Sequence, residues 1–300
     1  MSAIPALLAF VLAPLLPAVT NRAKAIMAGR IGPPLLQPYR DLSKLLRKAA
    51  VYSRTTTWLF RAGPVAGFGS VALASALVPF GGRPPLIAFP GDLLLLVYLL
   101  GFARFVAVVA ALDTGSSFEG MGASREVTFS TLAEPALVLA LAALARRTGG
   151  LSLSTMLGRN TGDVWAHGAP ALALVALVLL IVFLAENGRI PVDDPATHLE
   201  LTMVHEAMIL DHGGPDLAFI LYSAALKLWL LGALLVGLVV PVHTGSLWVD
   251  TAAAVGGMLG LAVVVGLVES QMARLRLLHV PNLLVGATAL SVLALVFLVR

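Results

Sequence analysis

The residues best suited to chemistry lie in one polar stretch, residues 186–216, which reads ENGRIPVDDPATHLELTMVHEAMILDHGGPD. It holds seven of the 16 acidic residues and three of the six histidines, although long apolar runs border it on both sides. These residues are Glu186, Asp193, Asp194, Glu200, Glu206, Asp211, Asp216, His198, His205 and His212. Because ionisable groups are costly in hydrocarbon, such a stretch indicates either a docking surface for another protein or part of a path for charge.

The histidine spacing argues against a metal site. Successive histidines are seven residues apart, which places them about 10 Å from each other along a helix, too far to share one ion. His205-Glu206 begins like a zincin motif, but Ile209 stands where the second histidine belongs. The chain has no cysteine, so thiolate ligation of an iron–sulfur cluster or a nickel–iron centre is excluded. We therefore expect this chain to bind no cofactor and to have no catalytic centre of its own.

Three further ionisable residues lie inside apolar segments: Arg104, Glu134 and Lys227. Charges embedded in a membrane cost roughly 2.5–3.5 kcal/mol or more each, so they normally pair or line a wet cavity. One interpretation is static ion pairing, for example of Arg104 with Glu134. The other is a hydrated relay of groups whose protonation responds to a neighbouring charge. The residues leave both interpretations open.

The elements that must position these groups are membrane helices. The chain is 59% hydrophobic and 12% charged, whereas soluble domains are about 25% charged. A spanning helix needs roughly 20 apolar residues, and no composition shift divides the chain, so we predict an all-α integral membrane protein with one polytopic domain over 1–300. The eight predicted transmembrane helices are 3–20, 63–80, 92–112, 128–145, 168–186, 217–240, 248–268 and 281–299. Asp113, Glu119 and Glu126 are expected in the short connection before the fourth.

Loop charges predict the orientation. The connections after the first, third, fifth and seventh predicted spans hold 13 Lys and Arg in total, and the other three hold four. By the positive-inside rule, both termini lie outside and the 186–216 stretch faces the cytoplasm. The first segment lacks a basic start and is followed by Arg22 and Lys24, so we expect a retained helix and not a signal peptide. The net charge of +4 reflects this topology and does not indicate nucleic-acid binding.

Two helices are predicted outside the membrane. Residues 38–50 form an amphipathic pattern with Arg40 and Lys44 on the polar face, which is typical of an interfacial helix that contacts lipid headgroups or shapes a cavity mouth. Residues 195–212 form the second, with Asp194 as N-cap and Gly213-Gly214-Pro215 as the stop. On it, His198, His205 and His212 share one stripe.

Three motifs resemble one family. They are GPPLLQPYRDLSKLLRK after the first helix, MGASREVTFSTLAEPAL leading into the fourth, and the 186–216 stretch. Together they are similar to the respiratory complex I subunit 1 (H subunit) family, and within it to the membrane-anchor subunits of group 4 NiFe hydrogenases of the formate hydrogenlyase and hydrogenase-4 type. The resemblance covers nearly the whole chain.

The resemblance implies roles for individual residues. Glu134 matches the glutamate that follows the Arg125 motif, and the E-x-x-R-x-P-x-D…E loop matches Glu186, Arg189, Asp193 and Glu200. We expect the proton or ion relay to comprise Glu134, Glu186, Asp193, Glu200, Glu206, Asp211, Lys227 and Arg104, of which Lys227 departs from the family's pattern. We expect the docking residues for a partner to be Arg189, Asp194, His198, His205, Arg40 and Lys44.

The resemblance also implies partners and location. We expect a prokaryotic inner-membrane subunit that couples electron transfer to ion translocation, beside antiporter-like membrane subunits and a peripheral arm whose subunits carry Fe–S clusters and a NiFe centre. The quinone-reducing branch has more glutamates after the loop proline, where this chain has Ala196 and His198, which favours the hydrogenase branch. The alternatives are the H subunit of a quinone-reducing, complex I-like NADH dehydrogenase and a free-standing ion transporter.

Overall fold

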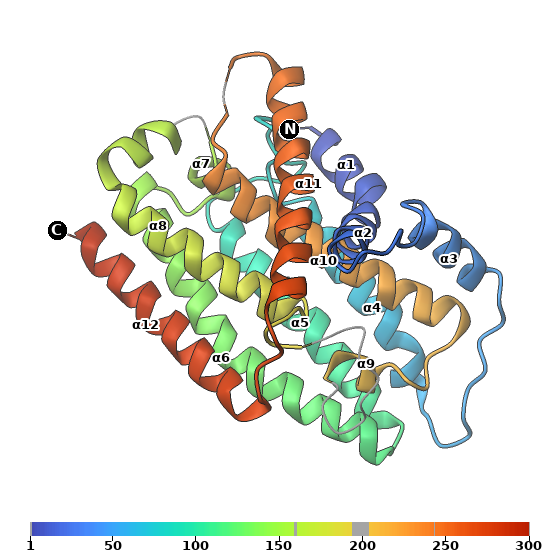
Figure 1. Cartoon of the computed structure of the whole chain (residues 1–300). Coiled ribbons are helices and arrows are strands. Elements are labelled where there is room, and N and C mark those ends of the chain that lie inside the picture. The colour runs from blue at the N-terminus through green and yellow to red at the C-terminus, as the bar shows by residue number, and fades with distance from the viewer. Residues whose placement is uncertain (1, 159–160, 194–203, 243, 300) are drawn as a thin grey trace.

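The computed structural model describes residues 2–158, 161–193, 204–242 and 244–299, and within these ranges the chain is helical (Figure 1). A lone bridge between Phe80 and Arg83 accompanies the helices there. The elements are α1 (Ile4–Leu12), α2 (Leu15–Met27), α3 (Gln37–Leu46), α4 (Trp58–Ser75), α5 (Asp92–Asp113), α6 (Ser117–Thr148), α7 (Leu153–Met156), α8 (Thr161–Glu186), α9 (His205–Met208), α10 (Gly214–Val239), α11 (Leu247–Gln271), the 3-10 turn η1 (Leu277–His279) and α12 (Val280–Val299).

Six helices in the described ranges are long and apolar enough to cross a membrane: α5, α6, α8 from Gly168, α10, α11, and η1 with α12. The pair α1 and α2, bent by 42° at a short break, makes a seventh if it counts as one span. The remaining predicted span, 63–80, corresponds to α4, which begins earlier and carries Arg61, Pro64 and three glycines. This composition keeps α4 below the apolarity of the other spans.

Small residues bring the long helices together. The Ser291 hydroxyl of α12 donates to the Ala136 carbonyl of α6 at 3.0 Å. The Thr20 hydroxyl of α2 donates to the Ala262 carbonyl of α11 at 3.1 Å. Such contacts require backbones to approach closely, which small side chains allow and which membrane helices use in place of a hydrophobic driving force. These contacts join α12 to α6 and α2 to α11.

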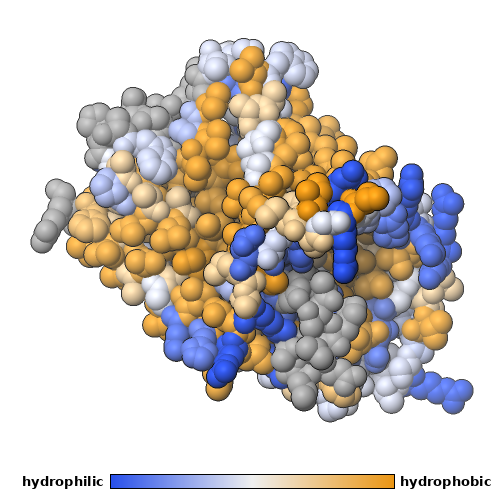
Figure 2. All heavy atoms as spheres, in the orientation of Figure 1, coloured by the Kyte–Doolittle hydropathy of each residue, from blue (hydrophilic) through white to orange (hydrophobic). Residues whose placement is uncertain are grey.

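The surface agrees with a membrane setting. Figure 2 shows hydrophobic residues in a broad band across the face that carries α11 and α12. Hydrophilic side chains gather at the edge where α3 and the segment after it lie. A belt of apolar surface between more polar ends is what a bilayer requires of a spanning protein.

Three local predictions need correction or completion. Helix α6 starts at Ser117, not at 128, so Glu119 and Glu126 lie on that long helix and not in a connection. The amphipathic helix is confirmed but ends at Leu46, before residue 50. Its placement at a membrane interface stays a prediction.

The helix predicted over 195–212 is wrong in its described part. Only α9, His205–Met208, is helical there, and residues 194–203 lie outside the described residues. The predicted stop has the opposite role, because Gly213 is the N-cap of α10 and Pro215 lies in its first turn. Proline suits the first turn of a helix, where its missing N–H has no partner to lose. His212 therefore follows the helix instead of sharing a stripe with His205.

Candidate functional site

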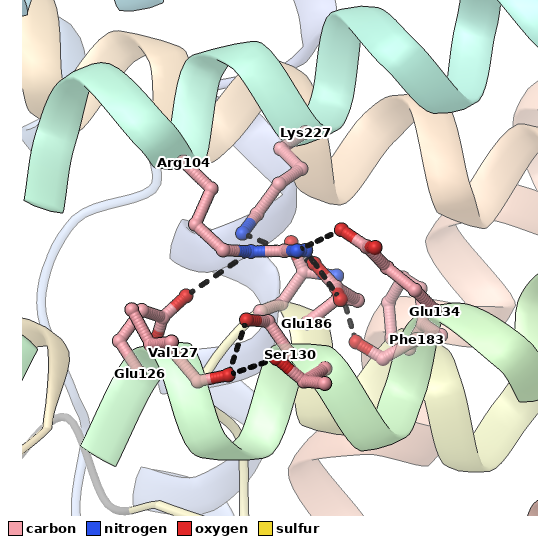
Figure 3. Close-up of polar contacts among 10 residues, drawn as sticks. Arg104, Glu126, Val127, Ser130, Glu134, Phe183, Glu186 and Lys227 are labelled. Carbon is pink, nitrogen blue, oxygen red and sulfur yellow. Dashed lines mark hydrogen bonds and ion pairs between the residues drawn. The ribbon is translucent and has the colours of Figure 1, made fainter. Parts of the chain in front are cut away.

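Four helices bring their charged side chains to one point around Arg104 of α5 (Figure 3). The guanidinium contacts both carboxylate oxygens of Glu186 at 2.6 Å. It is also paired with Glu134, and its Nε lies 3.7 Å from Glu126. Lys227 of α10 adds a second cation, with its Nζ 3.8 Å from Glu186. We call these five residues the Arg104 cluster.

Arg104 and Glu186 form a buried pair within the Arg104 cluster. The side chains of Arg104 and Glu186 are 11% and 4% exposed, so this pair is removed from solvent. A buried pair stays charged only if each partner is well satisfied. The planar guanidinium carries five N–H donors in a rigid fork that can contact several carboxylates, whereas the lysine ammonium is a compact charge with three donors. Arg104 is therefore the organising residue of the cluster.

A second charged group ties the segment after α8 to α2 and α11. Glu269 of α11, fully buried, lies 2.9 Å from Lys24 and 3.4 Å from Arg189. Four residues beyond Arg189, Asp193 lies 2.8 Å from Arg274. We call these five residues the Glu269 group. They fix the start of the polar stretch to two helices that are distant in sequence.

A cavity of about 400 Å³ joins the two groups. Its polar lining includes Arg104, Glu126, Glu186, Lys227, Arg189, Asp193, His205, Glu206 and His212. Its remaining wall is mostly apolar and reaches Pro14 in the break between α1 and α2, Pro17 in the first turn of α2, and Pro38 at the start of α3. A cavity with this many convergent polar groups can hold water and conduct protons between carboxylates.

The structure thus places most of the expected relay residues around one cavity. Glu186, Asp193, Glu206, Lys227 and Arg104 line it. Glu134 reaches Arg104 from outside the cavity wall. The ion pair expected between Arg104 and Glu134 is confirmed. These positions leave the relay itself a prediction.

Asp211 lies elsewhere. Its side chain is exposed, and its backbone N–H donates to the buried Glu119 carboxylate of α6 at 3.1 Å. Glu200, Asp194 and His198 lie outside the described residues. Among the expected docking residues, Arg40 and Lys44 are exposed on α3.

Two other docking candidates have internal contacts. Arg189 is paired with the buried Glu269, and His205 lines the cavity. Removal of His205 from water lowers the pKa of its imidazole. Burial likewise lowers the pKa of His212, whose ring stacks on Phe60 at 3.9 Å between centroids, against the opposing effect of Asp216 and Asp211. Both histidines therefore favour the neutral form.

Four members of these groups were not predicted as site residues from the sequence. They are Glu126 of the Arg104 cluster and Lys24, Glu269 and Arg274 of the Glu269 group. A signal was available, because Glu269 directly follows the predicted span 248–268 and Lys24 closely follows the first. Pairing across 245 residues of sequence, however, becomes visible only when α2 and α11 are known to be neighbours. Within the described ranges, no group of three or more His, Cys, Asp or Glu could hold a metal ion.

Comparison with known proteins identifies the family of the chain. The NADH dehydrogenase family profile matches residues 1–299. The chain belongs to this family. Its similarity to individual relatives then distinguishes between branches of the family.

Two hydrogenase subunits of Escherichia coli K12 are similar to the chain over nearly its whole length. Formate hydrogenlyase subunit 4 is 32% identical over 98% of this chain and 97% of its own length. Hydrogenase-4 component C is 29% identical over 97% and 93%. The H subunit of the NADH-quinone oxidoreductase of Rubrobacter xylanophilus is also 32% identical, but over only 57% of this chain and 53% of its own length.

The fold is shared with a respiratory complex. A chain in the structure of the membrane-bound sulfane sulfur reductase, an archaeal respiratory membrane complex, superposes with a TM-score of 0.82 at 20% identity, covering 98% of both chains. At this identity the likeness concerns the fold alone. The chain is thus a membrane protein of the NADH dehydrogenase family, related to formate hydrogenlyase, hydrogenase-4 and complex I H subunits.

Proposed function

We propose that this chain is the membrane-anchor and coupling subunit of an energy-converting NiFe hydrogenase complex of the formate hydrogenlyase type. The observation that carries the proposal is the Arg104 cluster, placed beside a cavity that also reaches the polar stretch from Arg189 to His212. End-to-end similarity to two hydrogenase subunits supports this branch over the quinone reductases, of which the Rubrobacter xylanophilus H subunit matches over 57% of the chain.

In this proposal the chain supplies no redox centre. Partner subunits of a peripheral arm carry the Fe–S clusters and the NiFe site, and they dock on the cytoplasmic side at the polar stretch and at Arg40 and Lys44 of α3. Antiporter-like membrane subunits lie alongside. The eight spans of the topology include α1 with α2 as one and α4 as another, in the prokaryotic inner membrane, and both termini face outward.

Coupling would begin at the docking segment. Asp193 and Arg189 belong to the Glu269 group, so displacement of their segment by a redox change would alter the charges that line the cavity. Glu186 and Glu134 would respond, because both share Arg104. When one carboxylate takes up a proton, Arg104 can strengthen its contact with a second, protonated carboxylate; the pKa of the second falls, it releases its proton, and the charge of the cluster is unchanged.

Metal content tests the redox part of the proposal. A tag on this chain would recover the complex from gently solubilised membranes, and elemental analysis would measure nickel and iron per chain. Nickel at one per chain together with iron is expected. Iron without nickel would instead assign the chain to the quinone-reducing branch. The mostly apolar wall of the cavity is the observation that favours that alternative. Absence of both metals from intact preparations would leave the free-standing transporter.

A further inference from the structure

The Glu134 side chain has an unusual position for a membrane carboxylate. The apolar part of α6 begins near residue 128 and the helix ends at Thr148, so Glu134 lies about 9 Å inside the nearer end of that part and about 20 Å from the other. Its side chain is nevertheless 42% exposed, although it is paired with Arg104. It is not among the residues that line the cavity. The 42% exposure, with Gly101 of α5 beside the carboxylate, indicates that the exposed part of Glu134 lies at the surface between α5 and α6, within the apolar part of α6.

The surface around Glu134 is apolar and aromatic. On α5, Gly101 lies next to the Glu134 carboxylate, since a Cβ added there would be 3.6 Å from Oε1. Residues at helical spacing around Gly101 are exposed large side chains, and α6 adds a matching strip. We call this surface the α5–α6 face, made of Leu94, Tyr98, Phe105 and Leu112 of α5 and Thr131, Glu134 and Val138 of α6.

Lipid alone cannot cover this face. Acyl chains would suit Leu94 and Phe105, but a charged group in contact with hydrocarbon costs roughly 2.5–3.5 kcal/mol or more. A second copy of the chain is no better. In a twofold contact centred on this face, Glu134 would meet the other Glu134, and like charges repel.

The charge of the Arg104 cluster specifies what is missing. Among the described residues of the cluster, three carboxylates (Glu126, Glu134 and Glu186) meet two cations (Arg104 and Lys227), which leaves one excess negative charge among these five when all are ionised. The carboxylate with the greatest exposure is Glu134, whereas Glu126 and Glu186 are 18% and 4% exposed. Among the described residues, Glu134 is therefore the carboxylate of this cluster that a complementary group from outside the bundle reaches most directly.

We propose that the α5–α6 face is covered by a transmembrane helix of a neighbouring subunit, and that this helix presents a basic side chain to Glu134. The helix packs on the aromatic stripe of α5, and its cation completes the charge balance of the Arg104 cluster. The inference depends on the membrane placement of α5 and α6 and not on the redox chemistry of the complex, so it stands or falls separately from the metal content.

Photo-crosslinking in the intact complex tests the occupant. p-Benzoylphenylalanine would replace Phe105, which is 62% exposed on the α5–α6 face, and in a matched control Phe297, which is 51% exposed on α12. Both replacements keep an aromatic ring. After irradiation of native membranes, the tagged chain would be purified and the crosslinked peptides sequenced.

The expected result is a crosslink from position 105 to one transmembrane helix of another membrane subunit, with a Lys, Arg or His within about one turn of the crosslinked residue. Position 297 should not reach that helix. Crosslinks from 105 to lipid only, to a second copy, or to a helix without a basic residue would overturn the proposal.

A charge substitution tests the contact itself. Glu134→Gln keeps the shape of the side chain and removes its charge, and it should lower recovery of the captured subunit by about tenfold or more, as expected when one partner of a buried charged pair is lost. Thr131→Val, on the same face, should leave recovery unchanged. Equal recovery with Glu134→Gln and Thr131→Val would contradict a charged contact, whatever the nickel content of the two preparations.

Discussion

Replacement of Arg104 by glutamine should destabilise this protein more than any exposed arginine replacement. In the structure the guanidinium contacts Glu186 through both oxygens at 2.6 Å, and the two side chains are 11% and 4% exposed. Without Arg104, Glu186 retains Lys227 at 3.8 Å as its neighbouring cation. Removal of one partner from a buried pair costs about 3–5 kcal/mol, because a buried charge is left uncompensated.

The measurement is the thermal midpoint of the purified protein in detergent. At about 2–4 °C per kcal/mol for a chain of this size class, the cost corresponds to a decrease of about 10 °C. The control is Arg47→Gln, since Arg47 is exposed at the end of α3. A surface change of this kind alters stability by less than about 0.5 kcal/mol.

The double variant Arg104→Gln/Glu186→Gln gives the decisive comparison. It removes the cation and the most buried carboxylate together, so it should recover a large part of the loss, with a coupling energy of about 1–3 kcal/mol. If Arg104→Gln resembles Arg47→Gln, or if the double variant is as unstable as the sum of the two single changes, the Arg104 cluster does not hold the bundle in the way described.

Three further predictions concern other parts of the molecule. Glu269→Gln leaves Lys24 and Arg189 without their shared carboxylate and should lower the thermal midpoint by several degrees. Proteolysis or hydrogen exchange should also show local opening at residues 189–193. An unchanged exchange pattern at these residues would contradict the role of the Glu269 group. Burial lowers the pKa of His212, so the unfolded chain binds more protons than the folded chain below about pH 6.5. Stability should therefore fall as the pH falls through that value. His212→Phe should flatten the dependence of stability on pH, and an identical pH profile in this variant would refute the prediction. The Asp113 carboxylate accepts from two backbone N–H groups at the start of α4, at 2.6 and 3.3 Å, so Asp113→Ala should cost about 1–2 kcal/mol in denaturant unfolding, and no change in midpoint would show that this cap is dispensable.

Apolar runs made most of the membrane helices predictable, because the bilayer imposes the same length and composition on each. The pair of Arg104 and Glu134 was also predictable, because both are charges inside apolar segments, where an unpaired charge is unfavourable. The start of α6 at Ser117 was not, because its first turns, SFEGMGASREV, are polar. Where a helix extends beyond the membrane, its outer turns are polar, so hydrophobicity does not show that the helix continues there.

The Glu269 group shows what the sequence could not reveal. Glu269 looks like an ordinary end of a span, and Lys24 like an ordinary positive-inside residue. Their contact depends on the close packing of α2 on α11, which the Thr20 to Ala262 hydrogen bond and the small residues Ala23 and Gly266 permit. Turn chemistry was misleading at Gly213-Gly214-Pro215, since glycine and proline can end one helix or begin the next, and here they begin α10.

The central claim is that the Arg104 cluster couples electron transfer to ion movement, and one measurement tests it most directly. The purified complex, with its nickel content verified, would be reconstituted into vesicles, and hydrogen evolution from reduced methyl viologen would be recorded together with internal pH and sodium. Glu186→Gln would be compared with the unaltered complex. Our account predicts that this variant still evolves hydrogen but builds no ion gradient, whereas hydrogen evolution with an undiminished gradient would contradict it.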